Sequence, residues 1–326
     1  MTIPNHSELK QRAREAVNAC PTQRQIITVH TAVLVGLSIL VSGADYLLSH
    51  MISGTGGLGN LGTQAILSTL QSMLPIVQML LLLGWNTGYF MTVLKITRGI
   101  PAGADSLKGG FSLFFPVLRT MLLEGMFYTG ITMFAFNAAS LIYMFTPWAN
   151  ELMTLAEPLL PGILSASPPV LEDAQVMLLM EAMIPMLVIF AVLYAAISIP
   201  VSYRLRMSTY CLIDMPRPGA LRAVGTSMKL MRGNCRNLFK LDLSFWWYHG
   251  VLLLASLVQM LPLLGLPLPL SFDGQYYLFY GINLLMTAAV YLLARNRVET
   301  AYAAAYDAIR EKPKENTVVL GNIFDM

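Results

Sequence analysis

Six long apolar stretches constrain this sequence more than any other feature. They lie at about residues 26–48, 69–94, 120–145, 176–200, 243–264 and 276–294. Each is long enough to cross the hydrocarbon core of a bilayer as a helix, which takes about 20 residues. None shows the alternation of polar and apolar residues that is typical of a transmembrane β-barrel. Because a spanning helix satisfies its own backbone hydrogen bonds, the sequence predicts an all-α, polytopic membrane protein with six transmembrane helices.

The composition agrees with membrane insertion. Of the 326 residues, 56% are hydrophobic and 12% are charged, whereas soluble domains have about 25% charged residues. A net charge of +3 gives no reason to expect nucleic-acid binding. The apolar run from Ile26 is too long for the core of a cleaved signal peptide, so we expect one integral membrane domain over residues 1–326. Because Cys20, Cys211 and Cys235 form no CxxC pair, we expect free thiols, no metal and no other cofactor.

The basic residues predict the orientation. All 21 Lys and Arg residues fall before the first stretch, between the second and third, between the fourth and fifth, or after the sixth. Since Lys and Arg concentrate in cytoplasmic loops, both termini should be cytoplasmic and the protein should lie in the cytoplasmic membrane. The opposite side holds a glycine-rich connector at 53–62 and an acidic, proline-rich segment at 146–175, with room for a short interfacial helix at 149–156.

Three cytoplasmic segments have the pattern of amphipathic helices. Residues 7–19 place Leu9, Ala13 and Val17 on one side, with Ser7 as the expected N-cap. Residues 219–236 carry apolar and basic side chains on different faces. Residues 296–311 carry one apolar stripe, so the sixth span should continue into the cytosol as one long helix.

The second of these segments belongs to a candidate binding face for anionic lipid of the inner leaflet or for a partner. Its basic residues are Arg217, Arg222, Lys229, Arg232, Arg236 and Lys240. Each Lys or Arg near an anionic leaflet contributes about 1 kcal/mol of attraction. An equally weighted interpretation is a connector helix that packs on the bundle and has merely solvated charges. The expected partners are membrane lipids, another membrane protein or a second copy of the chain.

Few polar residues lie inside the apolar stretches, and three of them have similar depths. Asn86, Glu124 and His249 all fall in the cytoplasmic half when depth is counted at about 1.5 Å per residue. They could converge as a proton-binding site or line a cavity open to the cytoplasm. The favoured interpretation is that Glu124 reaches toward Arg119 while the others make ordinary interhelical hydrogen bonds, since no adjacent acid or base completes a relay.

The motifs of common enzyme classes are absent from the sequence, including HExxH, GxSxG, the P-loop and GxGxxG. We therefore expect a non-enzymatic scaffold, assembly or lipid- or peptide-interacting protein that works through the basic face. The alternative is a small transporter or channel that uses the polar residues of the cytoplasmic half. In that case Pro75, Gly84, Gly88 and Pro185 would mark discontinuous helices.

The most distinctive stretch is VSYRLRMSTYCLIDMPRPGALRAVGTSMKLMRGNCRNLFKLDLSF at 201–245. It resembles a bacterial integral membrane family known as domain of unknown function 975, with a tyrosine at the exit of a span, an ILxDxP stop and a helix that ends SxxLMxGNxxxLFxLxLSF. The residues that match these motifs include Tyr203, Asp214, Pro216, Met231, Gly233, Asn234, Phe239, Ser244 and Phe245. The resemblance implies a bacterial inner-membrane protein, and it implies no reaction.

Three other segments resemble the family more loosely. They are ELKQRAREAV at 8–17, GYFMTVLKITRG at 88–99 and AAAYDAI at 303–309. The chain departs from the family in its run Trp246-Trp247-Tyr248-His249 and in its long acidic outer loop. Within the motif, Gly233-Asn234 is typical of a helix stop, the aromatic residues from Phe239 to Tyr248 are typical of an interfacial belt, and Asp242 is a candidate cap for the fifth span.

Overall fold

The computed structural model describes residues 4–54, 61–157, 173–217, 219–264 and 272–310, and this part of the chain forms helices and no strand. It divides into two compact units. Unit 1 contains Met1–Thr120 and Met207–Met326, and unit 2 contains Met121–Arg206. The single integral domain stays a prediction, and each unit is described by itself.

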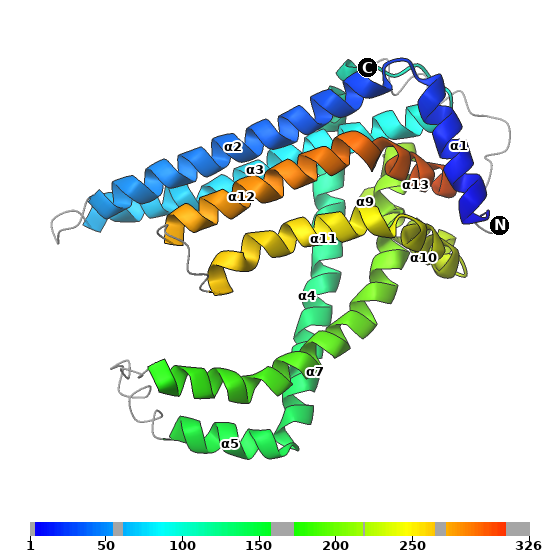
Figure 1. Cartoon of the computed structure of the whole chain (residues 1–326). Coiled ribbons are helices and arrows are strands. Elements are labelled where there is room, and N and C mark those ends of the chain that lie inside the picture. The colour runs from blue at the N-terminus through cyan, green and yellow to red at the C-terminus, as the bar shows by residue number, and fades with distance from the viewer. Residues whose placement is uncertain (1–3, 55–60, 158–172, 218, 265–271, 311–326) are drawn as a thin grey trace. The chain divides into compact units, whose positions relative to one another are not determined.

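Unit 1 contains four long helices that run side by side (Figure 1). They are α2 (Gln23–Gly54), α3 (Leu61–Thr97), α11 (Trp246–Met260) and α12 (Phe272–Val290). A π-helical turn, Tyr291–Arg295, leads α12 without a break into α13 (Asn296–Ile309). The predicted continuation of the sixth span is therefore confirmed.

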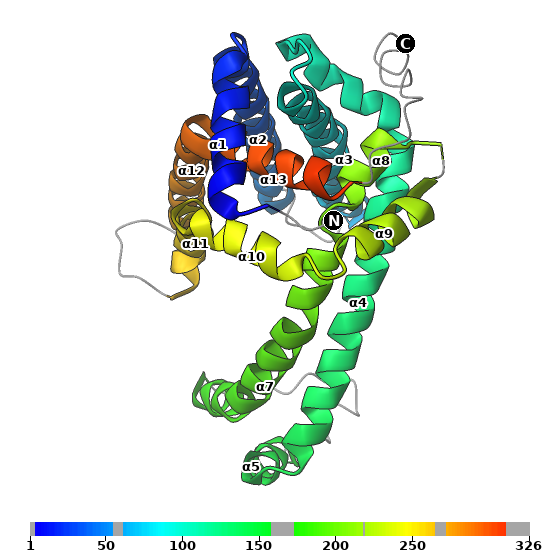
Figure 2. The same cartoon turned by 90° about the vertical axis from the view of Figure 1, so that its right-hand side faces the viewer.

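Short helices gather at one end of unit 1, which we call the basic end (Figures 1 and 2). They are α1 (His6–Ala19), α8 (Ser208–Asp214), α9 (Gly219–Leu230), α10 (Cys235–Ser244) and α13. Helix α1 buries Leu9, Ala13 and Val17, as its pattern predicted, and packs on α13. Its N-cap residue is Asn5, one residue before the helix, and not Ser7.

The predicted helix at 219–236 is divided in two. Helix α9 ends at Leu230, and Gly233 has φ +85°, a left-handed conformation that glycine adopts without steric cost. Helix α10 begins two residues later and meets α11 at an angle of 74°. The start predicted for the fifth span, residue 243, lies at this bend, and α10 and α11 are apolar enough to cross a membrane when taken together as one bent span.

Five helical segments of the described chain are long and apolar enough to cross a membrane, and the bent pair α10–α11 makes up to six. The five are Gln23–Gly54, Gly62–Thr97, Ala104–Met144, Glu181–Asp214 and Gly274–Ile309. The count by length and composition agrees with the all-α polytopic class that the sequence predicts.

Glycines in α3 allow a close helix contact rather than a break. Helix α3 runs unbroken through Pro75, and the 3-10 helix η2 (Ala104–Leu113) lies against it. A Cβ added at Gly88 would come within 1.7 Å of the Leu107 carbonyl oxygen, and one at Gly110 within 2.1 Å of the Gly84 carbonyl oxygen. The discontinuous second span considered for a transporter is therefore not found, and the glycines serve packing.

Unit 2 contains most of α4 (Phe114–Met144), from Met121 onward. It also contains α5 (Pro147–Ala156) and α7 (Asp173–Leu205). Helix α5 confirms the short helix expected at 149–156. The Tyr143 hydroxyl lies 2.7 Å from the Ala182 carbonyl oxygen and so links α4 to α7. Helix α7 continues through Pro185 and Pro200. Most of the acidic outer segment, at 158–172, lies outside the described residues.

Candidate functional site

A buried ion network connects three distant parts of unit 1. The Asp214 carboxylate, at the end of α8, accepts two hydrogen bonds from the Arg98 guanidinium, at 2.8 Å and 3.1 Å. The Arg310 guanidinium lies 2.7 Å from Asp214 Oδ2, and the Tyr306 hydroxyl donates to the same oxygen at 2.9 Å. Arg98 also binds Asp307 at 2.6 Å. Two arginines and two aspartates therefore balance one another in one cluster.

The acceptor at the centre of the network, Asp214, has no access to solvent, so its oxygens depend on donors from other helices. The Asp214 side chain is 0% exposed, whereas those of Arg98, Arg310 and Asp307 are 15%, 20% and 27% exposed. A buried carboxylate is stable only when donors satisfy its oxygens, and removal of one partner from a buried pair costs about 3–5 kcal/mol. The network thus fixes α8 against the ends of α3 and α13.

Arg98 stays charged at every physiological pH. Burial by itself would lower the pKa of the guanidinium, but hydrogen bonds and charge attraction from Asp307 and Asp214 raise it above its ordinary value. A base with a raised pKa in the folded state contributes stability below its unfolded pKa and loses it only as pH rises through the folded value. The ion pairs that Arg98 makes with Asp214 and Asp307 therefore do not depend on a change in the charge of Arg98 at physiological pH.

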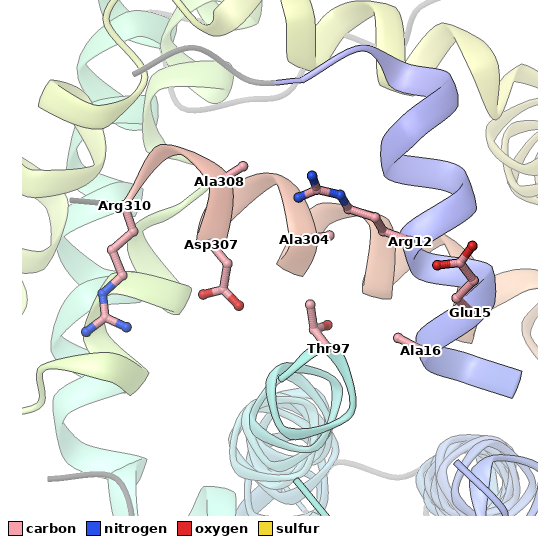
Figure 3. A pocket seen from close by; sticks show the side chains of 8 residues that line it. All are labelled: Arg12, Glu15, Ala16, Thr97, Ala304, Asp307, Ala308 and Arg310. Atoms are coloured by element: carbon pink, nitrogen blue, oxygen red, sulfur yellow. The ribbon is translucent and has the colours of Figure 1, made fainter. Parts of the chain in front are cut away.

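A cavity of about 500 Å³ lies beside the network, between α1 and α13 (Figure 3). In Figure 3 the Arg12 side chain extends from α1 toward α13, and the Asp307 carboxylate points toward Thr97. The charged lining residues already have partners: Arg12 binds Glu8 at 2.5 Å, and Glu15 accepts from Gln11 at 2.9 Å. Since Arg12 and Arg310 carry two positive charges and Glu15 and Asp307 two negative ones, the lining has no net charge with which to attract an ion.

The bend between α10 and α11 is held from α1. The Lys10 ammonium donates to the Ser244 carbonyl oxygen at 2.8 Å and lies 4.5 Å from the centre of the Phe245 ring. A cation at the end of a helix compensates its last carbonyl groups, and the aromatic face adds a cation–π contact. Ser244 and Phe245 end the family motif, so the motif's last residues form the joint.

The same bend is held from α13 by a chain of three polar residues. The Tyr302 hydroxyl donates to Asp242 Oδ1 at 2.6 Å, and His249 Nε2 lies 3.2 Å from the same hydroxyl. Because the hydroxyl gives its one proton to Asp242, His249 Nε2 is the donor to the Tyr302 oxygen. Asp242 was expected to cap the fifth span, but α11 has no side-chain cap. Its carboxylate binds α13 instead.

The other motif residues have structural surroundings too. Met231 is 0% exposed, and Asn234, 4% exposed, donates to the Leu230 carbonyl oxygen at 2.8 Å at the end of α9. Pro216 follows the short helix that ends at Asp214. Tyr203 belongs to unit 2, where the Arg206 guanidinium lies 5.9 Å from its ring centre.

The three residues of the expected intramembrane polar cluster have different neighbours. Asn86 Oδ1 lies 3.4 Å from an Arg295 nitrogen, and His249 binds Tyr302. Glu124 belongs to unit 2, where its charge acts on Tyr128 one turn along α4. Convergence of the three stays a prediction. Sequence reasoning found no relay partner for His249, because Tyr302 is 53 residues away in the chain.

The six residues of the candidate basic face all expose their side chains. They are Arg217, Arg222, Lys229, Arg232, Arg236 and Lys240. None of them takes part in an ion pair within the described ranges of the chain. Large apolar side chains are exposed among them: Leu221 at 76%, Phe239 at 51%, Leu243 at 60% and Trp246 at 70%. Helices α9 and α10 therefore present a surface that is both cationic and apolar.

The sequence contained no sign that Arg98, Asp214 and Tyr306 meet, since more than 90 residues separate each from the next. The only pointer was the resemblance itself. Arg98 lies in the segment 88–99, Asp214 in the central motif, and Tyr306 and Asp307 in the segment 303–309. These separate segments meet at one network, and Lys10 of the segment 8–17 holds the adjacent bend.

Long apolar helices with a polar, basic end define the chain as a multi-pass membrane protein. The family described as "Protein of unknown function (DUF975)" matches residues 1–312, so the chain belongs to this family. No curated protein and no solved structure matches the chain. The family membership confirms the expected resemblance and assigns no activity.

Proposed function

We propose that this chain is a non-enzymatic protein of a bacterial cytoplasmic membrane that docks anionic lipid headgroups on α9 and α10. The single observation that carries the proposal is the exposure of all six basic side chains of this face together with Leu221, Phe239, Leu243 and Trp246. A cationic helix with exposed aromatic and aliphatic side chains is typical of a helix that lies in the membrane interface. Both chain ends are then cytoplasmic, on the side of the anionic inner leaflet.

The bend before α11 supports this placement. Helix α10 turns 74° away from α11, so it does not continue along the axis of α11. It buries Leu238 and Leu241 toward the protein and leaves Phe239, Lys240 and Leu243 exposed. In that position lysine and arginine can reach phosphates while the apolar side chains enter the headgroup boundary.

The ion network supports a scaffold role. It fixes α8, which packs on α9, through bonds to the ends of α3 and α13. Lys10 and Tyr302 fix α10 in the same way. A surface held this firmly keeps its charges in one arrangement, which favours binding because little conformational entropy is lost. The described residues contain no group of three or more metal-ligating side chains.

The test is a lipid-dependent fluorescence measurement on the full chain in nanodiscs. An environment-sensitive dye is attached at Leu221→Cys in a background that lacks the three native cysteines, and its emission is compared in phosphatidylcholine and in a mixture with phosphatidylglycerol. We expect a blue shift with the anionic lipid. In a titration with phosphatidylglycerol, the double variant Arg222→Glu/Lys229→Glu should weaken the apparent affinity at least about 30-fold, since the two lost attractions alone correspond to about 2 kcal/mol.

The matched control is Arg14→Glu/Arg24→Glu, which makes the same change of net charge at exposed residues outside the face. An unchanged response in this control, together with a lost response in the face variant, supports docking. Equal responses in all variants contradict it. A stoichiometric protein that co-purifies with wild type and is lost from the face variant would replace the lipid by a protein partner. If cysteines at Asn86 and His249 react with hydrophilic thiol reagents, the transporter alternative gains support.

A further inference from the structure

Two adjoining cavities lie between α2 and α12, inside unit 1. The larger, about 610 Å³, is almost entirely apolar, and Ile39, Tyr46, Tyr277 and Leu285 are among its lining residues. The smaller, about 240 Å³, has a mixed lining in which Thr31, Asn86 and Arg295 lie among apolar side chains, and it is closer to the basic end. Val35, Leu284 and Ala288 line both cavities, so the two adjoin. We call the two together the groove, and its end at Thr31, Asn86 and Arg295 the polar head.

Arg295 lies at the polar head and makes no ion pair within the described ranges, although Glu299, one turn along α13, attracts it electrostatically. The π-helical turn at Tyr291–Arg295 places its side chain there, 8% exposed. The guanidinium lies 4.0 Å from the ring centre of Tyr291 and 5.1 Å from that of Tyr89. Within the described ranges its one hydrogen bond is to Asn86 Oδ1 at 3.4 Å, and its Nε has no acceptor.

A second polar group at this site is also without a partner. Thr31, 3% exposed, lines the same small cavity, and its hydroxyl makes no hydrogen bond in the described structure. Glu299, one turn along α13, interacts with the Tyr210 hydroxyl at 3.5 Å. A buried guanidinium without a carboxylate is costly, and a polar group inside a spanning segment usually marks a binding site. Glu299 attracts Arg295 without an ion pair between them, so the unpartnered Nε of Arg295 and the hydroxyl of Thr31 are groups that an anion would satisfy.

The depth of Arg295 indicates which anion. It follows Gly274, the first residue of the candidate span, by 21 residues. That is about 32 Å of helix, against about 30 Å for the hydrocarbon core. Arg295 therefore lies at the level of the lipid headgroups, while the apolar cavity lies at the level of the acyl chains. Arginine recognises phosphate through several directed N–H bonds.

We propose that this groove binds one anionic phospholipid, with its phosphate at Arg295 and Thr31 and an acyl chain along α2 and α12. The phosphate supplies the ion pair that Arg295 lacks in the described structure and accepts a hydrogen bond from its Nε. The acyl chain of the lipid fills the apolar cavity beyond Val35 and Leu284. The site is distinct from the surface of α9 and α10 and does not rest on the function proposed for that surface.

The test is native mass spectrometry of the purified full chain in mild detergent, titrated with phosphatidylglycerol or with phosphatidylcholine of the same acyl chains. We expect wild type to retain one phosphatidylglycerol and to bind phosphatidylcholine about tenfold or more weakly. Arg295→Gln should remove this preference. Ala288→Phe, which fills the junction of the two cavities and leaves Arg295 in place, should weaken retention of phosphatidylglycerol about tenfold.

The matched control is Arg297→Gln, which removes one positive charge at an exposed residue two positions away and should leave retention unchanged. If Arg295→Gln fails to fold, Ala288→Phe decides the question. Equal retention of both lipids by wild type overturns the proposal, and so does full retention by Ala288→Phe. Loss of the lipid from Arg222→Glu/Lys229→Glu would place it on the surface of α9 and α10 and would also overturn the groove site.

Discussion

The two buried arginine sites of unit 1 differ in one respect, which is charge balance. At the Asp214 network, Arg98 and Arg310 face two carboxylates, and the Asp214 side chain is completely buried. At the groove, Arg295 contacts two aromatic rings and an amide oxygen, and Glu299 attracts it without forming an ion pair. A paired cluster holds helices together, whereas a buried charge without an ion pair is stabilised by a ligand that supplies one. The difference separates a structural joint from a binding site.

The largest effect should come from Asp214→Asn. This change keeps the size of the side chain but removes the charge that Arg98 and Arg310 share, so both guanidinium groups lose a buried partner. We expect the free energy of unfolding to fall by about 3–5 kcal/mol. Thermal and denaturant unfolding in detergent, followed by circular dichroism, measures it.

The control for this change is Lys108→Gln, which breaks an exposed ion pair with Asp105 at 3.4 Å and should cost less than about 1 kcal/mol. The double variant Arg98→Met/Asp214→Leu should cost less than the sum of its two single changes, because neither partner is left as a buried unpaired charge. Additive losses would show that the two residues act independently.

An effect of intermediate size separates the two sites directly. Arg295→Met keeps a long apolar side chain against Tyr89 and Tyr291 and removes the unpaired charge. In zwitterionic detergent we expect its stability to stay within about 1 kcal/mol of wild type. Phosphatidylglycerol at about a hundredfold excess over its Kd should stabilise wild type by about 2.7 kcal/mol and should not stabilise the variant.

Thermal unfolding with and without the lipid measures this comparison, and Arg297→Met provides the matched control. A loss of 3 kcal/mol or more without lipid, of the size expected for a broken buried pair, would make Arg295 a structural residue like Arg98. The contrast between the two sites would then fail.

The smallest effect should come from Tyr302→Phe. It removes the hydroxyl that connects Asp242 to His249 and leaves the ring in place. The loss should be about 2 kcal/mol, since the hydroxyl makes two hydrogen bonds of about 1 kcal/mol net each. Since the bend is also held by Lys10, the α10–α11 angle should persist, and the dye response at Leu221→Cys should not change. A lost response would show that Tyr302 controls the basic face.

Much of the architecture could be predicted, because membrane insertion is read from local composition. The apolar stretches became α2, α3, α4, α7, α11 and α12, and the long continuation into α13 is present. Helix bounds were less predictable where a turn depends on neighbours. The helix expected at 219–236 ends at Leu230, just before the helix stop predicted at Gly233-Asn234, and Lys10 and Tyr302 hold the bend before α11 from other helices.

The candidate site was less accessible to sequence reasoning. Asn86 was singled out for its depth in the membrane, and the structure adds Arg295 as its neighbour, 209 residues further along the chain. The sequence showed no acidic partner for His249, yet the structure connects it to Asp242 because both side chains form hydrogen bonds with the Tyr302 hydroxyl. In both cases the informative partner comes from a helix distant in sequence, and a single sequence does not show which helices pack together.

The sequence by itself determined that the chain is a helical membrane protein with its charges at defined ends of its helices, because the length of an apolar run and the placement of Lys and Arg act locally on insertion. Only the tertiary structure decided which charges are paired. Packing brings Asp214 to Arg98 and leaves Arg295 beside aromatic rings. Pairing depends on distances between helices, and those distances arise from the packing of the whole unit.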